Sequence, residues 1–209
     1  MTANLPNLIT TARIAAAPLV AILIVQPRPI LRLCAFVLFV LAAVSDLWDG
    51  YLARSRGQVT PFGKMFDPIA DKFLLLATLI PLYLLTTNNL GLAGLPIFGP
   101  IPLWVVLILV GRELLITLLR LVAARRGRVV SARRLGKRKA VAQNIFIGAA
   151  ILWVSFRTPG SPPAHSWNWF SEFHGWFTAA FLVAALALTV ISAAFYLATF
   201  SRIFASEYP

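Results

Sequence analysis

The sequence predicts an all-α integral membrane protein built as a bundle of six transmembrane helices. Its 209 residues are 59% hydrophobic and only 12% charged, with a mean hydropathy of +0.82. A soluble domain carries about 25% charged residues, so this composition indicates that lipid surrounds most of the chain. Because a membrane span needs about 20 apolar residues, residues 1–209 suffice for a single bundle domain.

Six apolar stretches, separated by Pro, Gly and charged residues, give the expected helices. The N-terminal apolar stretch lacks the basic region and the convincing cleavage site of a signal peptide, so it is expected to be retained. The uncharged residues 86–102 and the Pro-, Ser- and Trp-rich residues 157–174 are expected to form loops, the latter at the membrane interface. The stretches cover residues 8–25, 30–54, 63–85, 103–124, 140–156 and 176–200.

Basic residues dominate the charge, with 19 Lys and Arg against 7 Asp and Glu and a net charge of +12. In a soluble chain this balance would favour nucleic acid as a partner, but here eight basic residues fall in a loop at 125–139, directly after an apolar stretch. That position predicts contact with anionic membrane lipids or phosphorylated substrates, and no nucleic-acid partner. The positive-inside rule places this loop, both termini and the segment 46–71 on the cytoplasmic side of the inner membrane.

Four of the seven acidic residues lie between positions 46 and 71, where the second helix ends and the third begins. Asp46 and Asp49 are three residues apart and Asp67 and Asp71 are four apart, so each pair shares one face of its helix. A short turn between the helices makes them antiparallel neighbours, which lets the four carboxylates converge. Converging carboxylates repel one another unless cations neutralise them, and oxygen ligands suit Mg²⁺ or Mn²⁺.

The competing interpretation treats these aspartates as helix-end charges at the interface that pair with Arg54, Lys64 and Lys72. A single Asp would favour that interpretation, whereas four on facing helix faces favour a metal site. Cys34 is the only cysteine, so disulfides and a cysteine-built metal site are excluded.

The aspartates belong to a longer pattern that resembles the signature of the CDP-alcohol phosphotransferase family. The resemblance implies a six-helix, homodimeric enzyme that uses a CDP-linked lipid donor, releases CMP, and holds two divalent ions, Mg²⁺ or Mn²⁺, per active site. It implies that Asp46, Asp49 and Asp67 are metal ligands. Asp71 is then the base that deprotonates the acceptor hydroxyl and a further ligand. The eight fixed residues across 26 positions are Asp46, Asp49, Gly50, Ala53, Arg54, Gly63, Asp67 and Asp71.

The resemblance also implies where the donor binds. Gly50, Ala53 and Arg54 line the cytidine diphosphate pocket in this interpretation, and a glycine lets a ligand approach the helix backbone closely. Near the N-terminus, Arg13 is expected at headgroup depth, where it either anchors the first helix or binds the donor. The full expected donor set is Asn7, Thr10, Asp49, Gly50, Ala53, Arg54 and Gly63.

Charges deep in the fourth apolar stretch indicate an acceptor site. Arg112 and Glu113 lie well inside it, where charges are costly and usually functional, and Arg120 follows two turns later. The alternative is an internal Arg112–Glu113 pair that only stabilises the bundle. Together with Gln143 and the basic residues that open the fifth helix, these residues resemble phosphatidylglycerophosphate synthases, which implies phosphatidyl transfer from CDP-diacylglycerol to sn-glycerol 3-phosphate. The expected acceptor-phosphate ligands are Arg112, Arg120, Lys137 and Lys139.

Three alternative functions remain open at this point. The same chemistry with another acceptor would make the chain an inositol phosphate transferase or a cardiolipin synthase that uses phosphatidylglycerol. A divalent-cation transporter would use the carboxylates as transport sites, but such sites are expected near mid-membrane on broken or repeated helices. A non-catalytic lipid-binding scaffold is disfavoured because all four aspartates are intact.

Overall fold

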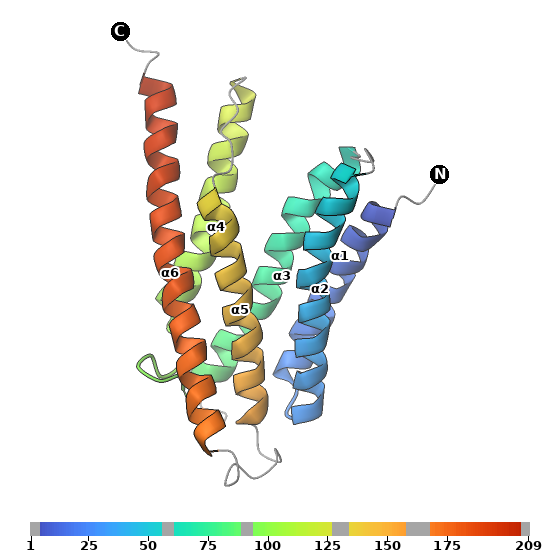
Figure 1. Ribbon diagram of the computed structural model, residues 1–209, viewed down its shortest axis with the longest axis vertical. Coiled ribbons are helices and arrows are strands. Elements are labelled where there is room, and N and C mark those ends of the chain that lie inside the picture. The colour runs from blue at the N-terminus through green and yellow to red at the C-terminus, as the bar shows by residue number, and fades with distance from the viewer. Residues whose placement is uncertain (1–4, 56–60, 89–93, 127–133, 158–167, 206–209) are drawn as a thin grey trace.

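A computed structural model describes most of the chain as six helices (Figure 1). The described residues are 5–55, 61–88, 94–126, 134–157 and 168–205. Within these ranges, the description of side chains excludes residues 5–7, 46–55, 61–68, 134–135, 168 and 202–205. The helices are α1 (Leu5–Val25), α2 (Pro29–Ser55), α3 (Pro61–Thr87), α4 (Leu103–Arg125), α5 (Arg134–Phe156) and α6 (Asn168–Ala205).

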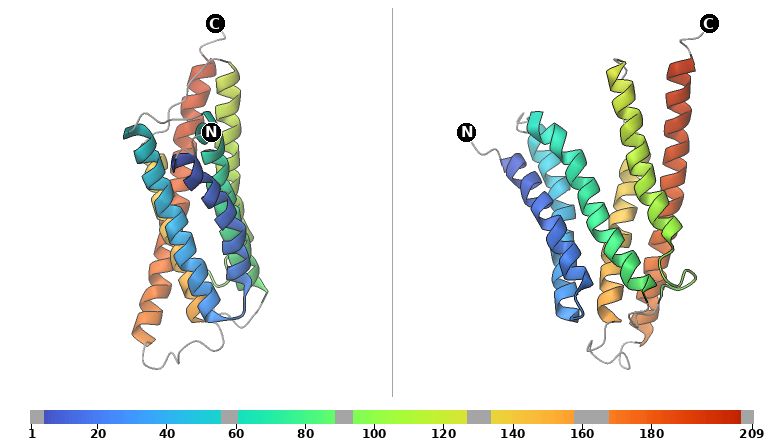
Figure 2. Two further views of the ribbon diagram at one scale, coloured as in Figure 1. Left: turned by 90° about the vertical axis from the view of Figure 1, so that its right-hand side faces the viewer. Right: turned by 180° about the vertical axis from the view of Figure 1, so that it is seen from behind.

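Successive helices run in opposite directions and form one bundle (Figure 1). Helix α1 packs on α2 and α3, α2 also packs on α5, and α5 packs along α6. Helix α4 packs on α3 and α6. The start of α1 and the end of α6 lie at the same end of the bundle, together with the end of α2 and the start of α3 (Figures 1 and 2). The predicted all-α fold is confirmed.

Four of the described helices are long and apolar enough to cross a membrane, namely α1, α3, α5 and α6. Among the described residues of α2, the apolar segment is Pro29–Ser45. In α4 the apolar run is interrupted by Arg112, Glu113 and Arg120. The hydropathy of the described residues therefore supports four spans directly.

Helix α6 begins earlier than the sequence analysis expects. It begins at Asn168, inside the predicted interfacial loop 157–174, whereas the predicted apolar stretch begins at residue 176. Helix α5 begins at Arg134, so basic residues open it as expected. Phe170 near the start of α6 packs edge-on against Phe156 of α5. Helical structure therefore extends beyond the apolar residues.

Large apolar side chains cover the outside of the bundle, whereas several polar side chains are buried inside it. Val37, Leu41, Leu107 and Leu118 are 55%, 61%, 62% and 59% exposed, respectively. A monomeric soluble protein rarely exposes so much contiguous apolar surface. The distribution is that expected of a bundle whose outer surface faces lipid.

Arg32 ties three helices together at the end of the bundle away from the α2–α3 connection. Its Nε donates a hydrogen bond to the carbonyl of Ile24 at 3.0 Å, and its Nη1 donates to the carbonyl of Val154 at 3.4 Å. Both carbonyls lie in the last turn of their helices, where intrahelical donors are lacking. The buried guanidinium therefore stabilises the ends of α1 and α5 from its position on α2.

The contact between α5 and α6 leaves no room for a side chain at position 175. A Cβ atom on Gly175 would lie 2.7 Å from the Trp153 ring and 3.1 Å from Cγ of Pro96. Trp153 is only 4% exposed, so its ring has little space to move away. Gly148 on α5 differs, because a Cβ there would be 3.5 Å from the ring of Phe36, an ordinary contact.

We therefore expect Gly175→Ala to lower the stability of the bundle by about 1–3 kcal/mol, the usual cost of overpacking a filled interior. Gly148→Ala is the matched control and should be neutral or stabilising, because Ala is the better helix former. Thermal unfolding of the two purified variants in the same detergent measures the difference. Equal stability of both variants would contradict the packing described for Gly175.

Candidate functional site

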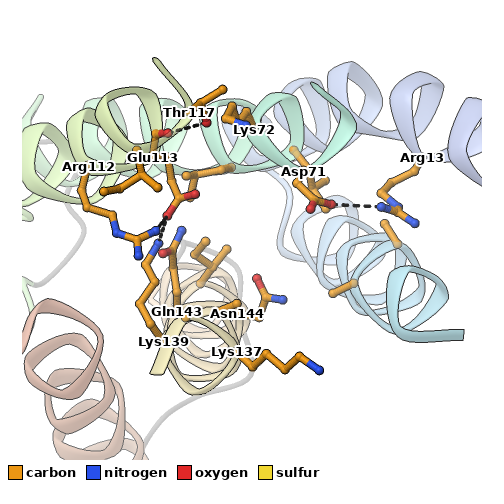
Figure 3. Close-up of a pocket in the computed structure, with 18 of the residues that line it drawn as sticks. Arg13, Asp71, Lys72, Arg112, Glu113, Thr117, Lys137, Lys139, Gln143 and Asn144 are labelled. Carbon is orange, nitrogen blue, oxygen red and sulfur yellow. Dashed lines mark hydrogen bonds and ion pairs between the residues drawn. The ribbon is translucent and has the colours of Figure 1, made fainter. Parts of the chain in front are cut away.

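A cavity of about 420 Å³ lies among five helices, α1 to α5, and is lined by charged, polar and apolar side chains (Figure 3). Apolar residues of α2 and α3 form part of its wall, among them Phe39 and Leu75. The charged and amide residues that line it are Arg13, Asp71, Lys72, Arg112, Glu113, Arg120, Lys137, Lys139, Gln143 and Asn144. The cavity thus brings Asp71 together with all four residues that the sequence assigns to the acceptor phosphate.

Asp71 on α3 is held by Arg13 of α1. Arg13 Nη1 donates to Asp71 Oδ1 at 3.0 Å, and the Arg13 side chain is fully buried while that of Asp71 is 54% exposed (Figure 3). A guanidinium at this distance fixes the orientation of a carboxylate through a charge-assisted hydrogen bond. Arg13 was expected only to anchor α1 or bind a donor, and its pairing with Asp71 was not foreseen.

Thr10 lies one turn before Arg13 and is 1% exposed, so this face of α1 is turned into the bundle. Its position is compatible with the donor-binding role that the sequence assigns to it. Asn7, on the same helix, has a side chain outside the described residues.

A shared carboxylate joins α4 and α5 across the cavity. Arg112 Nη1 donates to Glu113 Oε1 at 2.7 Å, and Lys139 Nζ donates to the same oxygen. Arg112 Nη2 also donates to Ser192 Oγ of α6 at 3.0 Å. The internal Arg112–Glu113 pair considered as the structural alternative is therefore present. It is part of a wider network, because Lys139, 3% exposed, is drawn in from another helix.

Arg120 and Lys137 line the same cavity but are more exposed than Arg112 and Lys139. The Arg120 guanidinium lies 5.6 Å from the ring centroid of Tyr196 on α6, a cation–π contact that orients it. Lys137 leaves α5 on a different side from Lys139 and extends away from the Glu113 network (Figure 3). These two cations therefore remain accessible to an entering anion.

The other predicted metal and donor residues fall on helix segments whose side chains are outside the described residues. The backbone of these segments is helical and belongs to the last turns of α2 and the first turns of α3. Asp67 accordingly precedes Asp71 by one helical turn on α3. The residues concerned are Asp46, Asp49, Gly50, Ala53, Arg54, Gly63 and Asp67.

The described side chains contain no group of three or more His, Cys, Asp or Glu residues that could hold a metal ion. Of the four signature aspartates, only Asp71 has a side chain among the described residues. Its carboxylate is half exposed to the cavity and is followed along α3 by the apolar wall residues Leu74 and Leu75. A hard oxygen donor at the edge of a cavity is the type of ligand that Mg²⁺ or Mn²⁺ uses.

Comparison with known proteins gives a consistent result. Residues 3–191 match the model of a family described as CDP-alcohol phosphatidyltransferase. A Bacillus subtilis protein named CDP-diacylglycerol–glycerol-3-phosphate 3-phosphatidyltransferase is 40% identical over 161 residues, covering 71% of this chain and 77% of the relative. A Mycobacterium tuberculosis protein named probable phosphatidylglycerophosphate synthase is 35% identical over 201 residues, covering 94% of this chain and 81% of the relative.

The shared carboxylate generates a prediction about stability. Glu113→Gln should destabilise the bundle because it leaves Arg112 and Lys139 close together without their counterion. Adding Lys139→Met should recover part of the loss, with a coupling of about 1–3 kcal/mol measured by a double-mutant cycle of thermal unfolding in detergent. Arg138→Met, an exposed neighbour, is the control and should add to Glu113→Gln without coupling. Additive behaviour of the Lys139 pair would show that the ion pair contributes nothing.

Proposed function

Because the chain belongs to the CDP-alcohol phosphatidyltransferase family, we propose that it transfers the phosphatidyl group of CDP-diacylglycerol to sn-glycerol 3-phosphate, giving phosphatidylglycerophosphate and CMP. The observation that carries this proposal is the cavity in which Asp71 lies with four cations suited to an acceptor phosphate. The name of the relative at 40% identity contains glycerol 3-phosphate as the acceptor, and the name of the relative at 35% identity contains phosphatidylglycerophosphate as the product. That agreement favours glycerol 3-phosphate over inositol phosphate or phosphatidylglycerol.

The acceptor phosphate binds among Arg112, Arg120, Lys137 and Lys139 in this proposal. A phosphate dianion entering an apolar bundle has to exchange its water for charge-assisted hydrogen bonds. Glu113 already neutralises one charge of the Arg112–Lys139 pair, so the exposed cations Arg120 and Lys137 supply the remaining attraction. The phosphate-free end of the acceptor then points into the part of the cavity where Asp71 lies.

Asp71 acts as the general base. Its carboxylate takes the proton of the primary acceptor hydroxyl while that oxygen attacks the phosphorus that carries the diacylglycerol. The bond from this phosphorus to the CMP oxygen breaks, and CMP leaves with the electron pair. Arg13 is a positioning residue in this scheme, because its hydrogen bond to Asp71 Oδ1 fixes the orientation of the carboxylate.

Asp46, Asp49, Asp67 and Asp71 are proposed to hold two divalent ions, Mg²⁺ or Mn²⁺. The helical backbone supports this in part, since Asp67 and Asp71 are one turn apart on α3. When bound, such ions neutralise the charge that develops on the departing CMP oxygen. A divalent-cation transporter is disfavoured, because the cavity beside Asp71 is rich in cations that would repel a transported metal ion.

The donor is proposed to bind at the end of the bundle where α2 ends and α3 begins. Thr10, buried on the same face of α1 as Arg13, supports this placement. The other proposed donor residues are Asn7, Asp49, Gly50, Ala53, Arg54 and Gly63. We propose that these helix ends lie at the membrane boundary, where a lipid donor can keep its acyl chains in the bilayer while the soluble CMP departs.

All six helices are proposed to span the membrane, with both chain ends, the basic segment 125–139 and the active site on the cytoplasmic side. Alternation of helix direction supports this, since α2 and α4 run beside helices that are apolar enough to cross (Figure 1). The excess of Lys and Arg at one end of the bundle sets the orientation. A homodimer remains part of the proposal on the basis of the family resemblance.

The function is tested by CMP release from purified protein with CDP-diacylglycerol and each candidate acceptor in turn. We expect release with sn-glycerol 3-phosphate and little with inositol phosphate or phosphatidylglycerol. In the same assay Lys137→Ala should raise the KM for glycerol 3-phosphate roughly tenfold, the loss of one charge-assisted contact. Arg138→Ala, an adjacent exposed cation that does not line the cavity, should leave it unchanged. Preference for another acceptor would refute the proposed function.

The role of Asp71 gives a separate prediction. Asp71→Asn keeps the size of the side chain and a hydrogen-bond acceptor for Arg13 but removes the base, so turnover should fall by at least about 100-fold. Binding of CDP-diacylglycerol, measured in the absence of acceptor, should be largely retained because the other carboxylates remain. Turnover close to that of the unmodified enzyme would exclude Asp71 as the base.

A further inference from the structure

Gln143 is a buried amide in the cavity wall that the proposed reaction has not yet used. It lies on α5, one turn after Lys139, and is 5% exposed. Its side chain extends from α5 toward the Arg112–Glu113–Lys139 network (Figure 3). Its Oε1 is buried and has no hydrogen-bond partner among the described residues.

An unpartnered amide oxygen is costly in this position. Gln143 is 5% exposed, and Phe146 and Ile147, which follow on α5, are 0% and 1% exposed, so bulk water does not replace the missing hydrogen bond. Buried polar atoms in proteins are nearly always hydrogen-bonded, and an exception calls for an explanation such as a missing ligand. The cavity that Gln143 lines supplies the space for one.

The chemistry of this atom restricts the ligand group. An amide oxygen only accepts hydrogen bonds, so it repels the oxygens of a phosphate dianion and requires a donor instead. Arg112 Nε on α4 is likewise a buried donor without a partner among the described residues. A molecule with a phosphate and a hydroxyl on neighbouring carbons offers an acceptor to Arg112 and a donor to Gln143.

We infer that Gln143 recognises the secondary hydroxyl of the acceptor, the hydroxyl that does not react, and thereby selects acceptors that carry it. This inference rests on the proposed function and deepens it. The primary hydroxyl forms the new oxygen–phosphorus bond and gives its proton to Asp71. The secondary hydroxyl keeps its proton and donates it in a hydrogen bond to Gln143 Oε1. A site that hydrogen-bonds a substrate hydroxyl rejects the analogue lacking it, because the buried protein atom is then left unpaired.

The test pairs a change in the enzyme with the matching change in the substrate. The analogue is 3-hydroxypropyl phosphate, which keeps the phosphate and the primary hydroxyl and lacks only the secondary hydroxyl. For the unmodified enzyme, kcat/KM for sn-glycerol 3-phosphate should exceed that for the analogue by roughly tenfold or more. For Gln143→Met, an unbranched apolar replacement of similar length, this ratio should fall toward one, mainly through slower reaction of glycerol 3-phosphate.

Gln26→Met is the matched control, because Gln26 follows α1 at the opposite end of the bundle and bonds the carbonyl of Ile22. Its ratio should equal that of the unmodified enzyme. A Gln143→Met ratio that equals the unmodified one would overturn the inference. So would an unmodified enzyme that uses both acceptors equally well, a result that needs no folded variant. CMP release with neither compound would instead refute the proposed acceptor, which keeps the two failures distinct.

Discussion

Charged groups inside a bundle that faces lipid need counterions within the protein. Here the carboxylate of Glu113 is the counterion of two cations. Glu113 accepts hydrogen bonds from Arg112 beside it and from Lys139 on the next helix. Arg112 reaches on to Ser192, so α4, α5 and α6 are joined at one depth. Without this carboxylate the two cations would repel each other, and the wall of the cavity that they form would open or collapse.

The cavity lies between α1 and α3 on one side and α4 and α5 on the other, and each side has its own group of charged residues. Arg13 and Asp71 join α1 to α3, and the Glu113 network joins the second set. The first pair presents a half-exposed carboxylate, which suits proton transfer, whereas the second presents cations, which suit a phosphate. A substrate with a phosphate at one end and a hydroxyl at the other can contact both sets. The distribution of charge thus supports the proposed direction of the acceptor in the site.

Local sequence patterns predicted the parts of this arrangement that depend on spacing along one helix. Apolar stretches located six helices, and Arg112 and Arg120, which the sequence assigned to one acceptor site, both line one cavity. The pairing of Arg13 with Asp71 joins residues 58 positions apart and left no local pattern. A buried Arg in an apolar helix was the available signal that a partner existed. The start of α6 at Asn168 was missed because polarity marks where the membrane ends and does not mark where a helix ends.

The Glu113 network also bears on how the product departs. In the proposed reaction the phosphate held by the cations is not consumed, because it is carried unchanged into phosphatidylglycerophosphate. Any contact that strengthens its binding before the reaction strengthens it equally afterwards, and such uniform binding does not accelerate the chemical step. By offsetting one of the two positive charges of Arg112 and Lys139, Glu113 weakens the hold on both molecules. A permanently bound carboxylate in the phosphate site is therefore a means of letting a lipid product return to the bilayer.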